Sequence, residues 1–120
     1  MFIRKLQSCV EITAGDGTIL RELLNSNKND LKINYSLARA VLKAGETSKE
    51  HRLKSSEVYY ILIGEGEIFI DSERCVVSEG DAVYIPPDSK QKLKNTGEGE
   101  LVFLCIVDPG WKPEDEEILE

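Results

Sequence analysis

The only histidine of the chain, His51, lies in a polar segment that also carries Glu57. An imidazole and a carboxylate can bind a metal ion, and together they can also transfer a proton. Gln91 is a third candidate, because it alternates with three lysines and shares a strand face with Leu93. A buried amide needs a partner, since leaving it unpaired costs about 1–3 kcal/mol. We therefore expect His51, Glu57 and Gln91 to converge in the interior.

This convergence allows several kinds of chemistry. A divalent metal ion of unknown identity could bind to His51, Glu57 and Gln91, with water completing its coordination. His51 and Glu57 could instead act as a catalytic pair that abstracts a proton beside a carbonyl group. In a metal-free protein the same groups could simply hydrogen-bond one another in a polar ligand pocket. Tyr59, Gln91 and Arg39 are the expected pocket residues, and Arg39 could pair with Glu57 if its strand faces inward.

The elements that must position these residues are short strands. Apolar stretches ending at glycine, proline or aspartate recur about every eight to ten residues, which is typical of an antiparallel sandwich or barrel. The expected strands span residues 37–42, 58–63, 67–71, 74–77, 82–85, 90–94 and 101–107. Residues 17–25 have a helix-like spacing of apolar side chains and predict a short N-terminal helical turn.

The composition limits the classes of protein to consider. A chain of 120 residues corresponds to one domain. Its 15 Lys and Arg against 22 Asp and Glu give a net charge of −7, which argues against nucleic-acid binding. Five acids in the last ten residues predict a solvated tail. We expect no signal peptide, no membrane span, inert thiols at Cys9, Cys75 and Cys105, and a cytoplasmic location.

The segments around His51 and Gln91 resemble the two motifs of the cupin family. The first family motif is Gly, five residues, His-x-His, three or four residues, Glu, six residues, Gly. The chain matches it at Gly45, His51, Glu57 and Gly64, with Leu53 at the second histidine position. The second family motif is Gly, five residues, Pro-x-Gly, two residues, His, three residues, Asn. The chain matches it at Gly80, Pro86 and Asn95, with Asp88 for the glycine and Gln91 for the histidine.

This resemblance implies an all-β fold, a double-stranded β-helix that forms a small jelly-roll barrel over residues 35–108. Residues 1–34 would be a strand or helix segment packing on the barrel or on a partner subunit, and residues 109–120 an acidic tail. Family members hold their metal with the histidines and glutamate of the first motif and the histidine of the second. Because Leu53 cannot bind a metal and Gln91 offers only an amide, a dioxygenase that needs three histidines is disfavoured.

The chain resembles small prokaryotic cupins that are often described as related to mannose-6-phosphate isomerase. The sequence favours a small-molecule-binding protein. The alternatives are a metal-assisted isomerase or epimerase acting on a sugar or sugar phosphate, and a barrel that serves only as an interaction module. An outward stripe of Tyr60 and Leu62 predicts a homodimer, unless the N-terminal segment covers that face. Trp111 is expected to cap the barrel mouth or to lie at a subunit interface.

Overall fold

The computed structural model describes all 120 residues. Along its strands, inward-facing and outward-facing side chains alternate. In β5 (Ser56–Ile63), Glu57, Tyr59 and Ile61 are buried, whereas Tyr60 and Leu62 are exposed. The other elements are η1 (Leu6–Ser8), β1 (Glu11–Thr13), β2 (Ile19–Asn25), β3 (Ser36–Leu42), β4 (His51–Leu53), β6 (Glu65–Ile70), β7 (Glu73–Ser78), β8 (Ala82–Ile85), β9 (Gln91–Asn95), β10 (Leu101–Asp108), η2 (Pro113–Asp115) and β11 (Glu116–Ile118).

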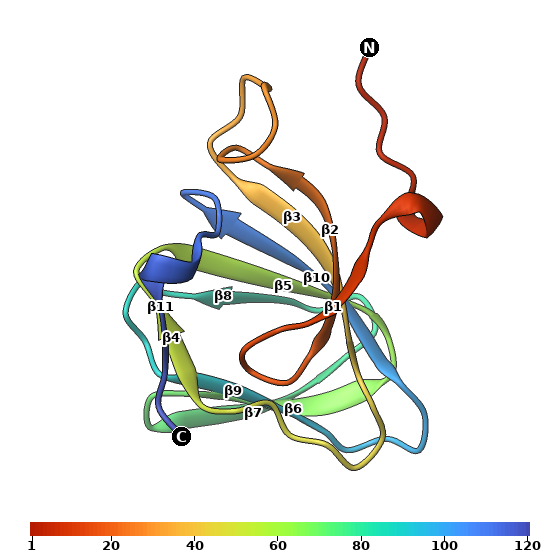
Figure 1. Cartoon of the computed structure of the whole chain (residues 1–120). Coiled ribbons are helices and arrows are strands. Elements are labelled where there is room, and N and C mark those ends of the chain that lie inside the picture. The colour runs from red at the N-terminus through yellow and green to blue at the C-terminus, as the bar shows by residue number, and fades with distance from the viewer.

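The strands form two antiparallel sheets that face each other (Figure 1). The six-stranded sheet has the order β1-β2-β3-β10-β5-β8, and the five-stranded sheet has the order β11-β4-β9-β6-β7. Neighbours in each sheet come from distant parts of the chain, as when β10 lies between β3 and β5. This architecture confirms the expected all-β barrel. The short helical turn near the N-terminus lies at Leu6–Ser8.

Two local expectations were wrong. Residues 17–25 contain the strand β2 rather than a helix, and a register shift between Glu22 and Leu24 interrupts its pairing with β3. Such a bulge moves apolar residues to both sides of the strand, which mimics helical spacing. The acidic tail is not freely solvated, because Glu116–Ile118 pairs with His51–Leu53. The helices are short 3-10 turns, and none is long and apolar enough to cross a membrane.

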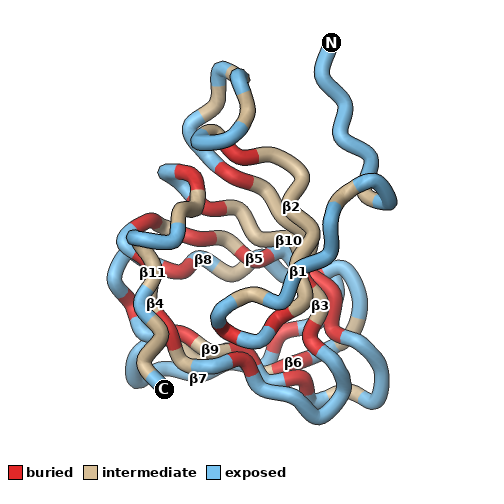
Figure 2. Tube along the Cα trace, in the orientation of Figure 1, coloured by how far each residue is buried: buried red, intermediate tan, exposed pale blue.

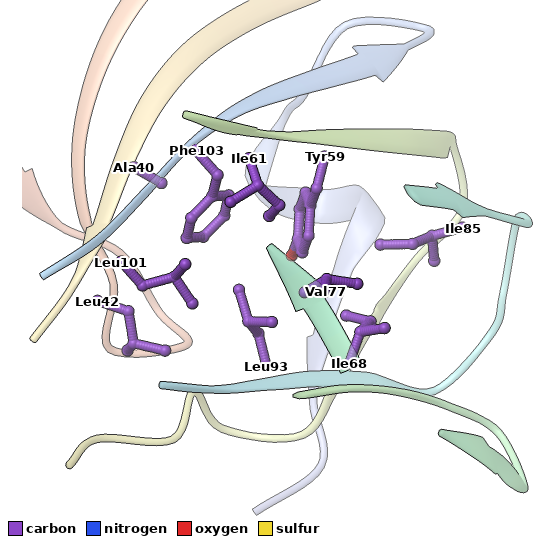
Figure 3. Close-up of a cluster of buried hydrophobic side chains, with 10 residues drawn as sticks. All are labelled: Ala40, Leu42, Tyr59, Ile61, Ile68, Val77, Ile85, Leu93, Leu101 and Phe103. Atoms are coloured by element: carbon purple, nitrogen blue, oxygen red, sulfur yellow. The ribbon is translucent and has the colours of Figure 1, made fainter. Parts of the chain in front are cut away.

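The hydrophobic core fills the space between the sheets. Its ten buried residues are Ala40, Leu42, Tyr59, Ile61, Ile68, Val77, Ile85, Leu93, Leu101 and Phe103 (Figure 3). The rings of Tyr59 and Phe103 pack with centroids 4.8 Å apart. Buried residues lie along the strands of both sheets, whereas the N-terminal segment is exposed and extends away from the barrel (Figures 1 and 2). Tyr60 and Leu62 on β5 are exposed, so the N-terminal segment does not cover them.

Tight turns account for two of the motif positions. Gly64 has φ +93°, and a Cβ atom there would lie 2.8 Å from the carbonyl oxygen of Glu100. Only glycine adopts this backbone conformation without strain. Asp88, which replaces the glycine of the second motif, has φ +64°. Aspartate tolerates this region better than most residues do, so the turn between β8 and β9 is kept despite the substitution.

Candidate functional site

A cavity of about 210 Å³ lies between the two sheets. Its wall from the six-stranded sheet includes Leu20, Glu57 and Phe103, and its wall from the five-stranded sheet includes His51 and Glu116. The loop between β1 and β2 adds Asp16 and is tied to the segment before β4, because the Lys49 N–H donates to the Asp16 carbonyl at 2.7 Å. Segments that are far apart in the sequence thus line one cavity.

The cavity runs from the molecular surface to a buried inner end. Lys28 and Ile12 line its outer part, and the Lys28 side chain is 58% exposed. His51, Glu57 and Tyr59 line its inner part and are all buried. Charged groups are strongly affected by such burial, because the interior screens them poorly. The inner end is therefore the part of the cavity suited to specific recognition or proton transfer.

Glu57 is the most perturbed acid of this inner end. Burial raises the pKa of its carboxyl group to about 8, and the nearby carboxylates of Asp16 and Glu116 push it in the same direction. A hydrogen bond with the Gln91 amide opposes the rise. The Glu57 Oε1 atom is fully buried and has no hydrogen-bond partner. An unsatisfied buried oxygen is costly, so Glu57, which lines the cavity, would gain from a ligand that donates a hydrogen bond.

His51 is held in a defined orientation. Its Nδ1 atom lies 2.8 Å from the Lys49 carbonyl oxygen, which can only accept, so Nδ1 donates. In the neutral imidazole the lone pair then belongs to Nε2. Nε2 lies 3.7 Å from Asp16 Oδ2, and the other Asp16 oxygen accepts hydrogen bonds from the backbone N–H and the hydroxyl of Thr18. One Asp16 oxygen thus stabilises the β1–β2 loop, and the other faces His51.

Gln91 is buried beside His51, its register partner on β4. The Tyr59 hydroxyl donates to Gln91 Oε1 at 2.8 Å. Burial raises the pKa of the Tyr59 hydroxyl well above its usual value, so Tyr59 remains a hydrogen-bond donor. The structure therefore brings together His51, Glu57, Tyr59 and Gln91, with Tyr59 and Glu57 lining the cavity directly and Gln91 lying behind them.

Arg39 does not join this group, which corrects the expectation that it could line the pocket. On β3, Ser36 and Ala38 line the cavity and Ala40 is buried in the core. Arg39 alternates with them and therefore faces outward. There it lines a surface groove with Glu100. Arg39 therefore supplies no charge to Glu57.

Two acidic residues at the inner end of the cavity, and Glu22 at its outer end, were missed from the sequence. Asp16 sits in an Asp-Gly turn, and Glu116 belongs to the acidic run near the C-terminus. Glu116 accepts a hydrogen bond from Trp111 Nε1 at 3.3 Å, and partial burial raises the pKa of its carboxyl group. The Asp-Gly turn signals a hairpin, but no sequence pattern shows that either carboxylate points into the barrel.

The donor set does not fit a metal ion. No three side chains among histidine, cysteine, aspartate and glutamate are grouped closely enough to hold one. Gln91 Oε1, the atom that could bind a metal, accepts the Tyr59 hydroxyl. Leu53 is buried in the cavity wall where a second histidine would add a donor. The polar groups of the cavity are arranged for hydrogen bonding instead.

Comparison with known proteins establishes the family. Residues 38–107 match the sequence profile of the cupin domain. The chain belongs to the cupin family. An uncharacterized protein of Methanocaldococcus jannaschii is 42% identical over 106 residues, which cover 88% of this chain and 84% of that one. The oxalate-binding protein of Thermotoga maritima is 30% identical over 71 residues, covering 58% and 59% of the two chains.

Solved structures support the same cupin fold. The nucleoside dehydratase of Streptomyces superposes with a TM-score of 0.80, covering 100% of this chain and 92% of the dehydratase chain. Their sequence identity is only 17%, so this similarity extends to the fold alone. The cupin family generally binds small molecules in the barrel, and the activity of any one member depends on the residues inside it.

Proposed function

We propose that this cupin binds a small organic molecule at the inner end of its cavity, with Glu57 and His51 as the principal polar contacts. The observation that carries the proposal is Glu57, which lines a cavity of about 210 Å³ and has a buried oxygen, Oε1, without a hydrogen-bond partner. A ligand that donates a hydrogen bond to this oxygen would satisfy it. His51 offers a second polar contact within the same space.

A screen by thermal shift tests the proposal. Purified protein is mixed with small amines, polyols, sugars and carboxylates, and hits are repeated with Glu57→Leu, which removes the acceptor, and with Glu98→Leu. Glu98 is exposed in the loop before β10, so its variant carries the same chemical change outside the cavity. Ligands of the cavity should lose their shift in Glu57→Leu, which has no acceptor, and keep it in Glu98→Leu. Equal shifts in both variants would contradict binding at Glu57.

Divalent ions provide a separate arm of this screen. Elemental analysis of the protein as purified is followed by dialysis against a chelator and titration with Mg²⁺, Mn²⁺ and Zn²⁺. The donor set described above predicts far less than one ion per chain and no large thermal shift. A stoichiometric ion with a large shift would favour the metal-assisted alternative.

An isomerase-like enzyme is the second candidate function. It is favoured by the protonated Glu57 and the oriented His51 in one cavity, which could exchange a proton with a carbon beside a carbonyl group. Deuterium uptake from D₂O by a panel of aldoses and ketoses, followed by NMR, would reveal such exchange. The activity should disappear in Glu57→Gln and persist in Glu98→Gln.

We also propose that the protein forms a homodimer through the outward face of β5 and β8. Tyr60, Leu62 and Tyr84 are 40%, 38% and 62% exposed on this face. The register pairs Tyr84 with Val58, which points outward like Tyr60, so the exposed side chains belong to one surface. Burying them against a second copy would remove this apolar surface from water.

A further inference from the structure

Carboxyl groups outnumber cationic groups along the cavity. Asp16, Glu22, Glu57 and Glu116 all line it. Only Glu22 pairs with a lysine or arginine, through a 2.9 Å contact with Lys28 at the outer end. The three inner carboxyl groups have no such partner, and His51 is the only basic side chain near them. The inner end of the cavity therefore has an excess of acidic groups over basic ones.

The unpartnered oxygen of Glu57 is a second, independent indication that the inner end of the cavity binds a ligand. Glu57 is 6% exposed, and Oε1 finds no donor anywhere in the protein. The neighbouring acids do satisfy their oxygens in part, since Asp16 accepts from Thr18 and Glu116 accepts from Trp111. Glu57 lines the cavity, and a buried acceptor without a donor in the protein indicates that a molecule bound in the cavity supplies one.

The remainder of the wall is apolar. Ten of the twenty lining residues are hydrophobic, and they include the aromatic rings of Phe103 and Trp111. A metal ion would meet too few donor atoms in such a space. An anion would have to approach the carboxylates of Asp16 and Glu116, whose charges would repel it. A ligand with a charged donor at one end and an apolar body fits both parts of the wall.

We propose that the cavity binds a small organic ammonium ion, with its charged group among Glu57, Asp16 and Glu116 and its apolar body against Phe103. This inference rests on the proposed small-molecule function and assigns a ligand class to it. An ammonium group has three N–H donors and no acceptor, so one N–H can satisfy Glu57 while the nearby carboxylates of Asp16 and Glu116 stabilise the positive charge. Phosphorylated sugars and dicarboxylates are disfavoured by the same acids.

Three probes of equal length test the assignment: n-butylammonium, n-butanol and butyrate. They share the four-carbon body and differ in the charge of the head group. Binding is followed by calorimetry and by the Hε1 resonance of His51, which reports on the cavity because the chain has no other histidine. We expect n-butylammonium to bind about ten- to a hundredfold more tightly than either other probe, as a charge-assisted hydrogen bond allows.

Variants separate cavity binding from attraction to the acidic surface. Glu57→Gln should weaken n-butylammonium about tenfold or more and leave n-butanol nearly unchanged. Glu98→Gln should change neither, and Glu116→Gln replaces Glu57→Gln if the latter does not fold. Tighter binding of butanol or butyrate would overturn the ammonium assignment while keeping the small-molecule function. Amine binding that survives both cavity variants would also overturn the assignment, and no response to any probe would overturn both proposals.

Discussion

At the scale of single residues, Glu57 should control how stability depends on pH. Its pKa rises from 4.5 to about 8 on folding, so the folded protein keeps a proton that the unfolded chain releases between these values. The free energy of unfolding should then fall as the pH rises through this window, by about 1.4 kcal/mol per pH unit and on the order of 5 kcal/mol in total. Below pH 4.5 Glu57 is protonated in both states and does not lower the free energy of unfolding. Above about pH 8 the full decrease in the free energy of unfolding is reached.

The variant Glu57→Gln cannot ionise, so it should show a much flatter profile and be more stable than the wild type at pH 9. Urea denaturation at pH 5, 7 and 9 measures the difference. Glu98→Gln should follow the wild type, because it is exposed. A Glu57→Gln profile as steep as that of the wild type would place the titrating group elsewhere, for example at Glu116, whose pKa is also raised.

Tyr59 shows how one hydroxyl supports the polar end of the barrel. Tyr59→Phe removes the donor to Gln91 Oε1 and leaves a buried amide oxygen without a partner. We expect a loss of about 1–3 kcal/mol in the free energy of unfolding, measured by urea denaturation. Tyr60→Phe, on the exposed side of the same strand, should cost less than about 0.5 kcal/mol. Equal losses in the two variants would show that the hydrogen bond contributes little.

At the scale of elements, β4 explains why the site resembles that of a cupin yet lacks a metal-binding set. His51 and Leu53 share the inward face of β4, and Gln91 is the register partner of His51 on β9. The double variant Leu53→His, Gln91→His should therefore place three imidazoles beside Glu57 and bind about one Zn²⁺ or Mn²⁺ per chain. Elemental analysis after gel filtration measures it.

The single variants provide the controls for this prediction. Each adds one imidazole, so each should hold metal more weakly than the double variant does. A folded double variant that remains free of metal would show that the positions of β4 and β9 do not converge as the structure places them.

The elements also show what the sequence could predict. Spacing within a continuous segment located His51, Glu57 and the strand that carries Tyr59, because alternation is local. The spacing gave a wrong prediction at β2, where the bulge near Glu22 makes the apolar residues of a strand recur as they would in a helix. It also missed Asp16 and Glu116, since their positions depend on long-range contacts: the hydrogen bond from Lys49 to the β1–β2 loop, and the pairing of β11 with β4.

At the scale of the whole molecule, two features oppose each other in self-association. The outward face of β5 and β8 exposes Tyr60, Leu62 and Tyr84, and its burial favours a dimer. The net charge of −7 on each chain opposes the same contact. Salt screens this repulsion, because the Debye length falls from about 10 Å at 0.1 M to about 3 Å at 1 M. The proposed dimer should therefore become tighter as the salt concentration rises.

Sedimentation velocity at low and high salt measures this dependence. Leu62→Lys places a charge in the proposed contact and should shift the protein to monomer under all conditions. Val76→Lys is the matched control, because Val76 is an exposed apolar residue on β7 of the other sheet. It should leave the dimer intact. A wild-type protein that stays monomeric at high salt, or equal weakening by the two lysines, would mean that the face of β5 and β8 is not the contact.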